Sequence, residues 1–234
     1  MTNVAVPAIP SEDESYTLDE EGNRLTSHLS SGHTTDAANR LSEDDAYTYI
    51  YDLNGNLIEK APRQAPLSSW AYTYDAFDQL IAVSRDGLAV ERYRYDALGR
   101  RTAITTLDGT GSGTTLEDLR LINDGPDRSH DLVADGSGGG TSGGLLKARY
   151  SHGGSIDEPL QLEAFTLTGA LTGRFTYHTD HLGSVRFLTD ASGTIVNEYD
   201  YDSYGRPTTS VEATAQPFRY TGREYDEGET VPIC

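Results

Sequence analysis

The sequence predicts an all-β protein in which antiparallel β-hairpins stack side by side and form an extended, curled sheet. Three observations support this fold class. A tyrosine- and aspartate-containing motif recurs along the chain, the 234 residues include 15 tyrosines but only 5 phenylalanines, and 24 glycines and 9 prolines provide frequent turns. Tyrosine suits a pleated surface that is half buried, because its ring packs while its hydroxyl reaches a polar partner or water.

The recurring motif reads Tyr-x-Tyr-Asp-x-x-Gly. Its aspartates step by 23 residues from Asp52 to Asp75, by 21 from Asp75 to Asp96, and by 22 from Asp180 to Asp202. The repeat unit is therefore 21 to 23 residues long in these copies. A fixed period of this size is typical of repeat proteins in which each copy is one supersecondary unit.

Each part of the motif has a physical role. The two tyrosines, at i and i+2, lie on one face of a strand. The aspartate accepts hydrogen bonds from backbone N–H groups, and the glycine takes the positive φ that follows a type I turn. The expected turn residues are Asp19, Gly22, Asp52, Gly55, Asp75, Asp96, Gly99, Asp180, Gly183, Asp202 and Gly205. The expected repeat tyrosines are Tyr49, Tyr51, Tyr72, Tyr74, Tyr93, Tyr95, Tyr177, Tyr199 and Tyr201.

The residues after each turn are apolar or β-branched and return as a second strand, so one repeat is one hairpin. A single hairpin is marginal in water, and neighbouring hairpins must therefore pair along their edges. We expect residues 1–15 to be a disordered lead, residues 16–106 to hold the repeat hairpins, and residues 107–144 to be irregular, with two glycine-rich loops. For residues 36–46 we expect a short helix or a turn.

The formal net charge of −19 arises from 18 basic and 37 acidic residues, and we expect no segment to gather Lys or Arg into a patch. Nucleic acid is therefore not an expected partner. The single cysteine, Cys234, excludes an internal disulfide. Residues 1–15 lack a basic start and a long apolar run, so neither a signal peptide nor a membrane span is expected.

Two stretches resemble metal sites but favour a structural role. His178, Asp180 and His181 bring two imidazoles and a carboxylate together in sequence, yet neighbouring strand residues point to opposite faces and Asp180 belongs to a turn. The stretch from Asp52 to Glu59 begins like a calcium loop, but its glycine is fourth rather than sixth and its glutamate eighth rather than twelfth. We therefore expect no metal and no cofactor.

The sequence contains no strong pattern of catalytic residues. The sequence contains no Gly-x-Ser-x-Gly elbow, and its histidines occur in no catalytic signature. Alternation would place Asp200 and Asp202 on one face as a carboxylate pair, but Asp202 is part of a repeat turn. We expect no catalytic residue and no enzymatic activity.

The repeats resemble the YD repeats of the RHS family, which includes bacterial polymorphic-toxin carriers, shell subunits of insecticidal toxin complexes, and teneurins. Residues 150–160, 177–186 and 218–226 resemble the RHS core region in its usual order, which makes residues 145–230 an expected core-like region. The resemblance implies a partial β-spiral shell that encloses a C-terminal effector, and a secreted or cell-surface location.

The chain departs from the family pattern after Glu229-Thr230. Only Val-Pro-Ile-Cys follows, so residues 231–234 are expected to be an aberrant or truncated tail, without the family's autocleavage motif and toxin. The sequence thus predicts a structural β-shell segment whose partners are other shell segments or a toxin domain. Two alternatives stay open: a carbohydrate- or cell-surface-binding module that uses exposed tyrosines, and a truncated gene remnant without function.

Overall fold

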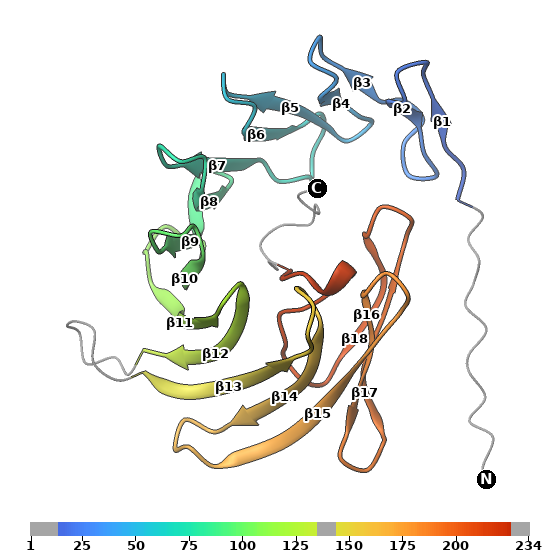
Figure 1. Ribbon diagram of the computed structural model, residues 1–234. Coiled ribbons are helices and arrows are strands. Elements are labelled where there is room, and N and C mark those ends of the chain that lie inside the picture. The colour runs from blue at the N-terminus through green and yellow to red at the C-terminus, as the bar shows by residue number, and fades with distance from the viewer. Residues whose placement is uncertain (1–13, 135–143, 226–234) are drawn as a thin grey trace. The chain divides into compact units, whose positions relative to one another are not determined.

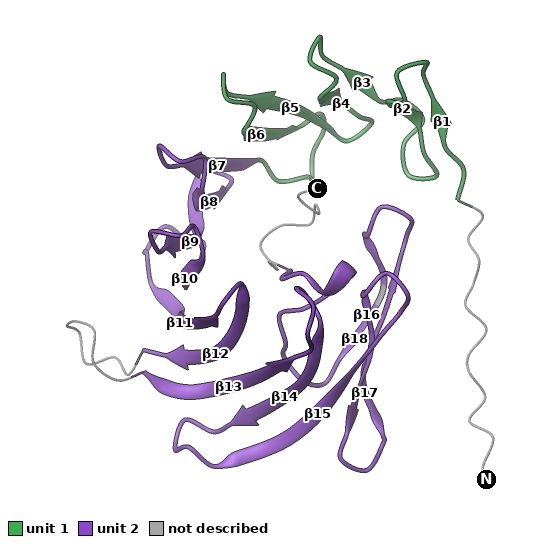
Figure 2. Ribbon diagram, in the orientation of Figure 1, with its two compact units in different colours: residues 1–69 green, residues 70–234 purple. Residues whose placement is uncertain are grey.

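A computed structural model describes residues 14–134 and 144–225 (Figure 1). The chain divides into two compact units, residues 1–69 and 70–234 (Figure 2). The described residues form β-strands and one short 3-10 turn, η1 (Tyr220–Gly222), which confirms the predicted all-β class. None of their helical structure is long and apolar enough to cross a bilayer.

The first unit contains two small antiparallel sheets. Strands β1 and β2 pair with each other, and β3, β4, β5 and β6 pair in sequence order. Their bounds are β1 Thr17–Leu18, β2 Arg24–Thr26, β3 Thr34–Thr35, β4 Leu41–Glu43, β5 Tyr47–Tyr51 and β6 Leu57–Pro62.

The second unit is one curled antiparallel sheet in which each strand pairs with the next along the chain (Figure 2). It is not closed, because β7 and β18 do not pair with each other. The expected stack of hairpins in an extended, curled sheet is confirmed. The bounds are β7 Trp70–Tyr74, β8 Leu80–Arg85, β9 Leu88–Tyr95, β10 Arg101–Leu107, β11 Thr115–Asp124, β12 Asp127–Val133, β13 Leu145–His152, β14 Pro159–Phe165, β15 Leu171–Thr179, β16 Val185–Asp190, β17 Ile195–Tyr201 and β18 Pro207–Glu212.

Residues 36–46 take the second of their two expected structures, a turn followed by β4, because the Asp36 carboxylate accepts the N–H groups of Ala38 and Arg40 and Asn39 has a φ of 58°. Residues 107–144 are less irregular than expected, since β11 and β12 lie within them and pair with their neighbours. The second glycine-rich stretch, the N-terminal lead and the tail lie mostly or wholly outside the described residues.

Among the described residues, nine turns that join two strands share one hydrogen-bond pattern. In the turn after β5, Asp52 N–H donates to the Asn56 carbonyl and Gly55 N–H donates to the Asp52 carbonyl. Gly55 has a φ of 96°, and the β5–β6 register shifts at Tyr51. This is a three-residue loop closed by a bulge, which matches the twist of the strands. The turns begin at Asp19, Asp36, Asp52, Asp75, Asp96, Thr166, Asp180, Asp190 and Asp202.

The side chain of the first turn residue also closes the turn. Asp96 Oδ1 accepts the N–H groups of Leu98 and Arg100 at 2.9 and 3.0 Å. The Arg100 guanidinium and these N–H groups lower the pKa of Asp96, because all of them favour the carboxylate. Thr166 uses its hydroxyl in the same way, accepting the N–H groups of Thr168 and Ala170.

The turns at Thr166 and Asp190 were not expected, and for the Asp36 segment a turn was expected only as an alternative to a short helix. The Asp190 turn keeps the Asp-x-x-Gly spacing, so the sequence could have predicted it. The strand before it lacks the tyrosine pair of the motif. In the Asp36 turn, Asn39 replaces glycine at the positive-φ position, as Asp78 does in the Asp75 turn. Asparagine and aspartate tolerate this backbone conformation better than other residues with a Cβ atom.

Substitutions at Gly193 can measure how much a positive φ costs a residue with a Cβ atom. Its φ is 83°, and an added Cβ would have no heavy atom within 4 Å, so a substitution there reports backbone strain alone. Gly193→Ala is expected to lower the free energy of unfolding by about 1 kcal/mol, and Gly193→Asn by less, in urea denaturation. Equal losses for the two variants would contradict this account of the turn.

Candidate functional site

The inner, concave face of the second unit carries the repeat tyrosines and is the candidate site. Tyr72, Tyr93, Tyr177 and Tyr199 are buried, with 7%, 3%, 5% and 0% of their surface exposed. Cross-strand pairing places Tyr177 opposite Leu188, which is also buried, so the apolar side chains share one face. The repeat tyrosines thus fill the core of the curled sheet.

The second tyrosine of the motif ties each hairpin to the one before it. The hydroxyl of Tyr95 donates to the Leu80 carbonyl at 2.7 Å, and that of Tyr201 donates to the Val185 carbonyl at 2.9 Å. Tyr51 makes the same bond to the Leu41 carbonyl at 2.8 Å. Each accepting carbonyl lies five residues after the start of the preceding repeat turn, at Asp36, Asp75 or Asp180. The contact is therefore a property of the repeat.

The first tyrosine of the motif finds an acidic or amide partner in several copies. Tyr49 donates to Asp44 Oδ2 at 2.7 Å, and burial together with the Asp44 carboxylate raises the pKa of Tyr49. Tyr199 donates to Glu212, and Asn197 and Gln216 donate to the Tyr199 oxygen. Sequence reasoning predicted polar partners for these hydroxyls but could not name them.

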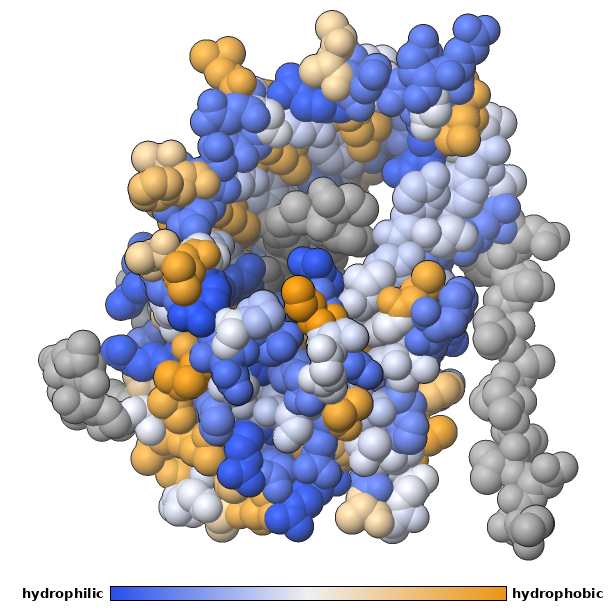
Figure 3. All heavy atoms as spheres, viewed as in Figure 1, coloured by the Kyte–Doolittle hydropathy of each residue, from blue (hydrophilic) through white to orange (hydrophobic). Residues whose placement is uncertain are grey.

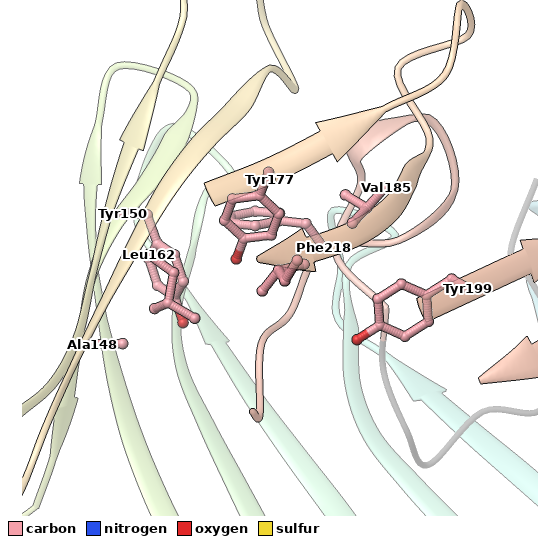
Figure 4. Packing of buried hydrophobic residues seen from close by; sticks show 8 residues of the cluster. Ala148, Tyr150, Leu162, Tyr177, Val185, Tyr199 and Phe218 are labelled. Atoms are coloured by element: carbon pink, nitrogen blue, oxygen red, sulfur yellow. The ribbon is translucent and has the colours of Figure 1, made fainter. Parts of the chain in front are cut away.

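The segment that follows β18 lies against the inner face; we call residues 213–225 the clasp (Figure 1). Its Phe218 is 4% exposed and packs edge-on against Tyr150 and Tyr177, with ring centroids 5.2 and 5.9 Å away (Figure 4). The buried cluster comprises Ala148, Tyr150, Leu162, Tyr177, Val185, Leu188, Tyr199 and Phe218. The clasp therefore completes the core rather than leaving the concave face open there.

Hydrogen bonds hold the start of the clasp. Asn197, which is fully buried, donates to the Thr214 carbonyl at 2.7 Å and accepts the N–H groups of Ala213 and Thr214 through its Oδ1. Farther on, Val185 N–H donates to the Arg219 carbonyl at 2.9 Å, so the clasp also contacts β16. These backbone polar groups of the clasp, which no longer pair within the sheet, thereby find hydrogen-bond partners.

An ionic network, buried at Arg128 and Asp131 and partly exposed at Glu224, holds the end of the clasp. Glu224 accepts from Arg128 of β12 at 3.2 Å and lies 3.7 Å from Arg101 of β10. Arg128 is 5% exposed and also pairs with Asp131 at 2.6 Å, and Asp131 accepts the Tyr150 hydroxyl at 2.7 Å. Asp131 and Glu224 together raise the pKa of Arg128, although burial opposes this shift. The clasp thus links strands that are not neighbours in the sheet.

The residues considered for catalysis or metal binding have other partners. Asp180 accepts turn N–H groups from Leu182 and Ser184, while His178 hydrogen-bonds the Thr189 hydroxyl. Asp202 closes its own turn, and Asp200 pairs with Arg186. Across residues 14–134 and 144–225, no group of His, Cys, Asp or Glu is arranged to hold a metal. The inner face is built for packing.

One rim of the second unit carries exposed apolar side chains that sequence reasoning did not single out. They stand at the tips of turns that join an odd-numbered strand to the next even-numbered one, and these turns share one edge of the antiparallel sheet. Figure 3 shows apolar side chains protruding over the β7–β10 hairpins. We call this set the apolar rim; it comprises Phe77, Leu98, Ile156, Leu182 and Tyr204, with 83%, 78%, 66%, 53% and 41% exposed.

Comparisons with known proteins identify similar chains. A family model described as the Teneurin YD-shell matches residues 4–116. The tRNA3(Ser)-specific nuclease WapA of Bacillus spizizenii is 30% identical over 224 residues, which cover 91% of this chain and 8% of that protein. The double-stranded DNA deaminase toxin A of Burkholderia cenocepacia is 28% identical over 231 residues, covering 92% of this chain and 16% of that protein.

Among solved structures, the Photorhabdus luminescens Tc holotoxin pore aligns with a TM-score of 0.47 and 14% identity, over 92% of this chain and 14% of that one. The crystal structure of TcdB2-TccC3 without its hypervariable C-terminal region aligns with a TM-score of 0.46. The chain therefore spans a small part of each protein that it matches.

Tyr201 and Tyr177 form a matched pair that tests the tyrosine contacts. Tyr201→Phe is expected to lower the free energy of unfolding by about 1 kcal/mol, because the Val185 carbonyl loses its donor. Tyr177→Phe is expected to be neutral or stabilising, because the Tyr177 hydroxyl is buried without a hydrogen-bond partner among the described residues. Chemical denaturation measures both values, and a larger loss for Tyr177→Phe would refute the assignment.

The ionic network that holds the clasp is tested by removing one partner or both. Asp131→Leu is expected to destabilise the second unit by about 3 kcal/mol, because Arg128 keeps its buried charge with fewer acceptors. The double variant Arg128→Met, Asp131→Leu is expected to recover part of this loss in thermal or urea unfolding, because the buried Tyr150 hydroxyl still lacks its acceptor. If the double variant is no more stable than Asp131→Leu, the network does not act through charge compensation.

Proposed function

Because the chain belongs to the RHS family of YD-repeat proteins, we propose that it is a structural segment of a β-shell that helps to enclose a toxin domain. The observation that supports this role best is the curled sheet with its tyrosine-lined inner face and internal clasp. A continuous antiparallel sheet satisfies its backbone groups along the whole wall, so such a wall extends by adding hairpins.

The apolar rim supports further shell segments as partners. Turn chemistry does not require large apolar residues at these positions, which favour small and polar residues. On the opposite rim, the corresponding turn tips include Gly87, Thr110 and Ser192, with Leu167 at one tip. The strand starts beside those turns also expose Leu88, Leu116, Leu145, Leu171 and Ile195, so the two rims differ in what stands at the turn tips. Exposed apolar groups in a row are typical of surfaces that are covered in the assembled state. We propose that neighbouring shell hairpins cover this rim.

The proposed cargo is a toxin domain of a longer protein or of a companion chain. The relatives are named for nuclease and deaminase toxins, but the chain matches only 8% and 16% of their lengths, so these activities are not transferred to it. Delivery from a secreted or cell-surface assembly is part of the same proposal. It rests on the kinship with toxin proteins.

Carbohydrate binding through exposed tyrosines is not proposed. The repeat tyrosines that this alternative required are buried or half buried, and several donate their hydroxyl to a backbone or side-chain acceptor. Tyr204 is the exposed exception, and it lies in a turn rather than on a sheet face. A stacking platform needs accessible ring faces, which these positions do not provide.

The shell role is tested in the assembly that contains this chain. The coding sequence on either side, or the adjoining genes, should encode further YD repeats and a toxin domain. In the assembled protein, Phe77→Asp with Leu98→Asp should open the wall and make the toxin domain at least several-fold more sensitive to trypsin, because two charges replace covered apolar groups.

The matched control is Leu167→Asp, which places a charge on the opposite rim. It should leave the protection of the toxin domain unchanged. Absence of repeat-encoding sequence around the chain, or a toxin domain that is cleaved equally fast in all variants, would reject the shell role.

A further inference from the structure

A group of arginines lies on the outer face of the second unit, opposite the tyrosine-lined core. Tyr93 of β9 is 3% exposed and points inward, so Arg92 and Arg94, which flank it, point outward and are exposed. The register aligns Arg94 with Ala103 of β10 and Ala103 with Arg120 of β11. Paired residues on adjacent strands share a face, so all three arginines lie on the outer surface.

The spacing of these arginines follows from sheet geometry. Arg94 and Arg120 are separated by one strand, which places their Cα atoms about 10 Å apart across the small Ala103 side chain. Arg92 and Arg94 lie two residues apart on the same strand, at about 7 Å. Together they form a triangle of guanidinium groups, which we call the arginine face.

The arginine face carries an excess of positive charge, because its three guanidinium groups share the outer face with one carboxylate, that of Asp118. Within residues 14–134 and 144–225, no carboxylate forms an ion pair with Arg92, Arg94 or Arg120. The nearest acidic residue in the registered rows, Asp118, accepts the Thr105 hydroxyl at 3.0 Å. The face is therefore positive within a chain whose net charge is −19.

Positive charge also predominates on the outer face of the strands from β13 to β15. Arg149 of β13 and Arg174 of β15 flank Glu163 of β14 in register, and both pair with its carboxylate. Two arginines thus share one carboxylate, which leaves one positive charge in excess. These two side chains remain 50% and 59% exposed. The outer rows from β9 to β15 therefore form a basic band on an acidic protein.

We propose that the arginine face binds an acidic segment of a protein partner. Each guanidinium can donate two parallel hydrogen bonds to one carboxylate. Alternate residues of an extended strand repeat at about 7 Å, which matches the spacing of Arg92 and Arg94. The residues that share these rows, Ala103, Thr105 and Leu132, are small or aliphatic and offer no ring for base stacking, which favours a polypeptide over nucleic acid.

The binding test uses the intact chain and fluorescently labelled poly-L-glutamate as the acidic polypeptide, with binding read by anisotropy at low and at high ionic strength. Binding is expected at low salt and should weaken steeply as salt increases, because the contacts are exposed. Arg94→Gln with Arg120→Gln is expected to weaken binding about fivefold or more. Circular dichroism establishes that the variant is folded.

The matched control is Arg63→Gln with Arg206→Gln, which removes the same charge from positions outside the arginine face. It should change the affinity less than about twofold. Absence of binding at low salt, or equal weakening by the two double variants, would overturn the proposal. Tighter binding of heparin or single-stranded DNA through the same two arginines would assign the face to another kind of polyanion and would also overturn it.

Discussion

The turn that joins the two strands of each repeat is the constraint on which the structure depends. A carboxylate or hydroxyl oxygen at the first position accepts two backbone N–H groups, and the fourth residue takes a positive φ. These bonds fix a one-residue bulge and therefore the register of the hairpin. Because a one-residue slip would move every side chain to the opposite face, the turn decides that the tyrosines point inward.

Once the tyrosines share a face, their hydroxyl groups can connect successive repeats. The bond from Tyr95 to the Leu80 carbonyl crosses from one hairpin to the preceding one, and Tyr201 repeats it toward Val185. Local turn geometry is thereby converted into a regular contact between units, as in other repeat proteins. Phenylalanine could fill the same volume but could not make this bond.

The clasp and the outer face give the second unit its two distinct surfaces. On the inside, Phe218 packs among buried rings, and the partly exposed Glu224 pairs with the buried Arg128. On the outside, Arg92 and Arg94 of β9 are exposed and Arg120 of β11 is half-buried, beside small side chains. The two surfaces of the sheet therefore differ in composition, because the inner one is packed with rings and the outer one carries charge.

The sequence alone determined the hairpins, the repeat period and the inward tyrosines, because turn chemistry and strand alternation are local properties. It did not reveal the Thr166 turn, because a threonine hydroxyl accepts the two backbone N–H groups there in place of the usual aspartate carboxylate. Only the tertiary structure placed Glu224 against Arg128 and aligned Arg94 with Arg120, because these pairs are 96 and 26 residues apart in the chain. Arg92 and Arg94 are neighbours in the sequence as well, but Arg120 joins them only through strand pairing, which decides which distant residues become neighbours.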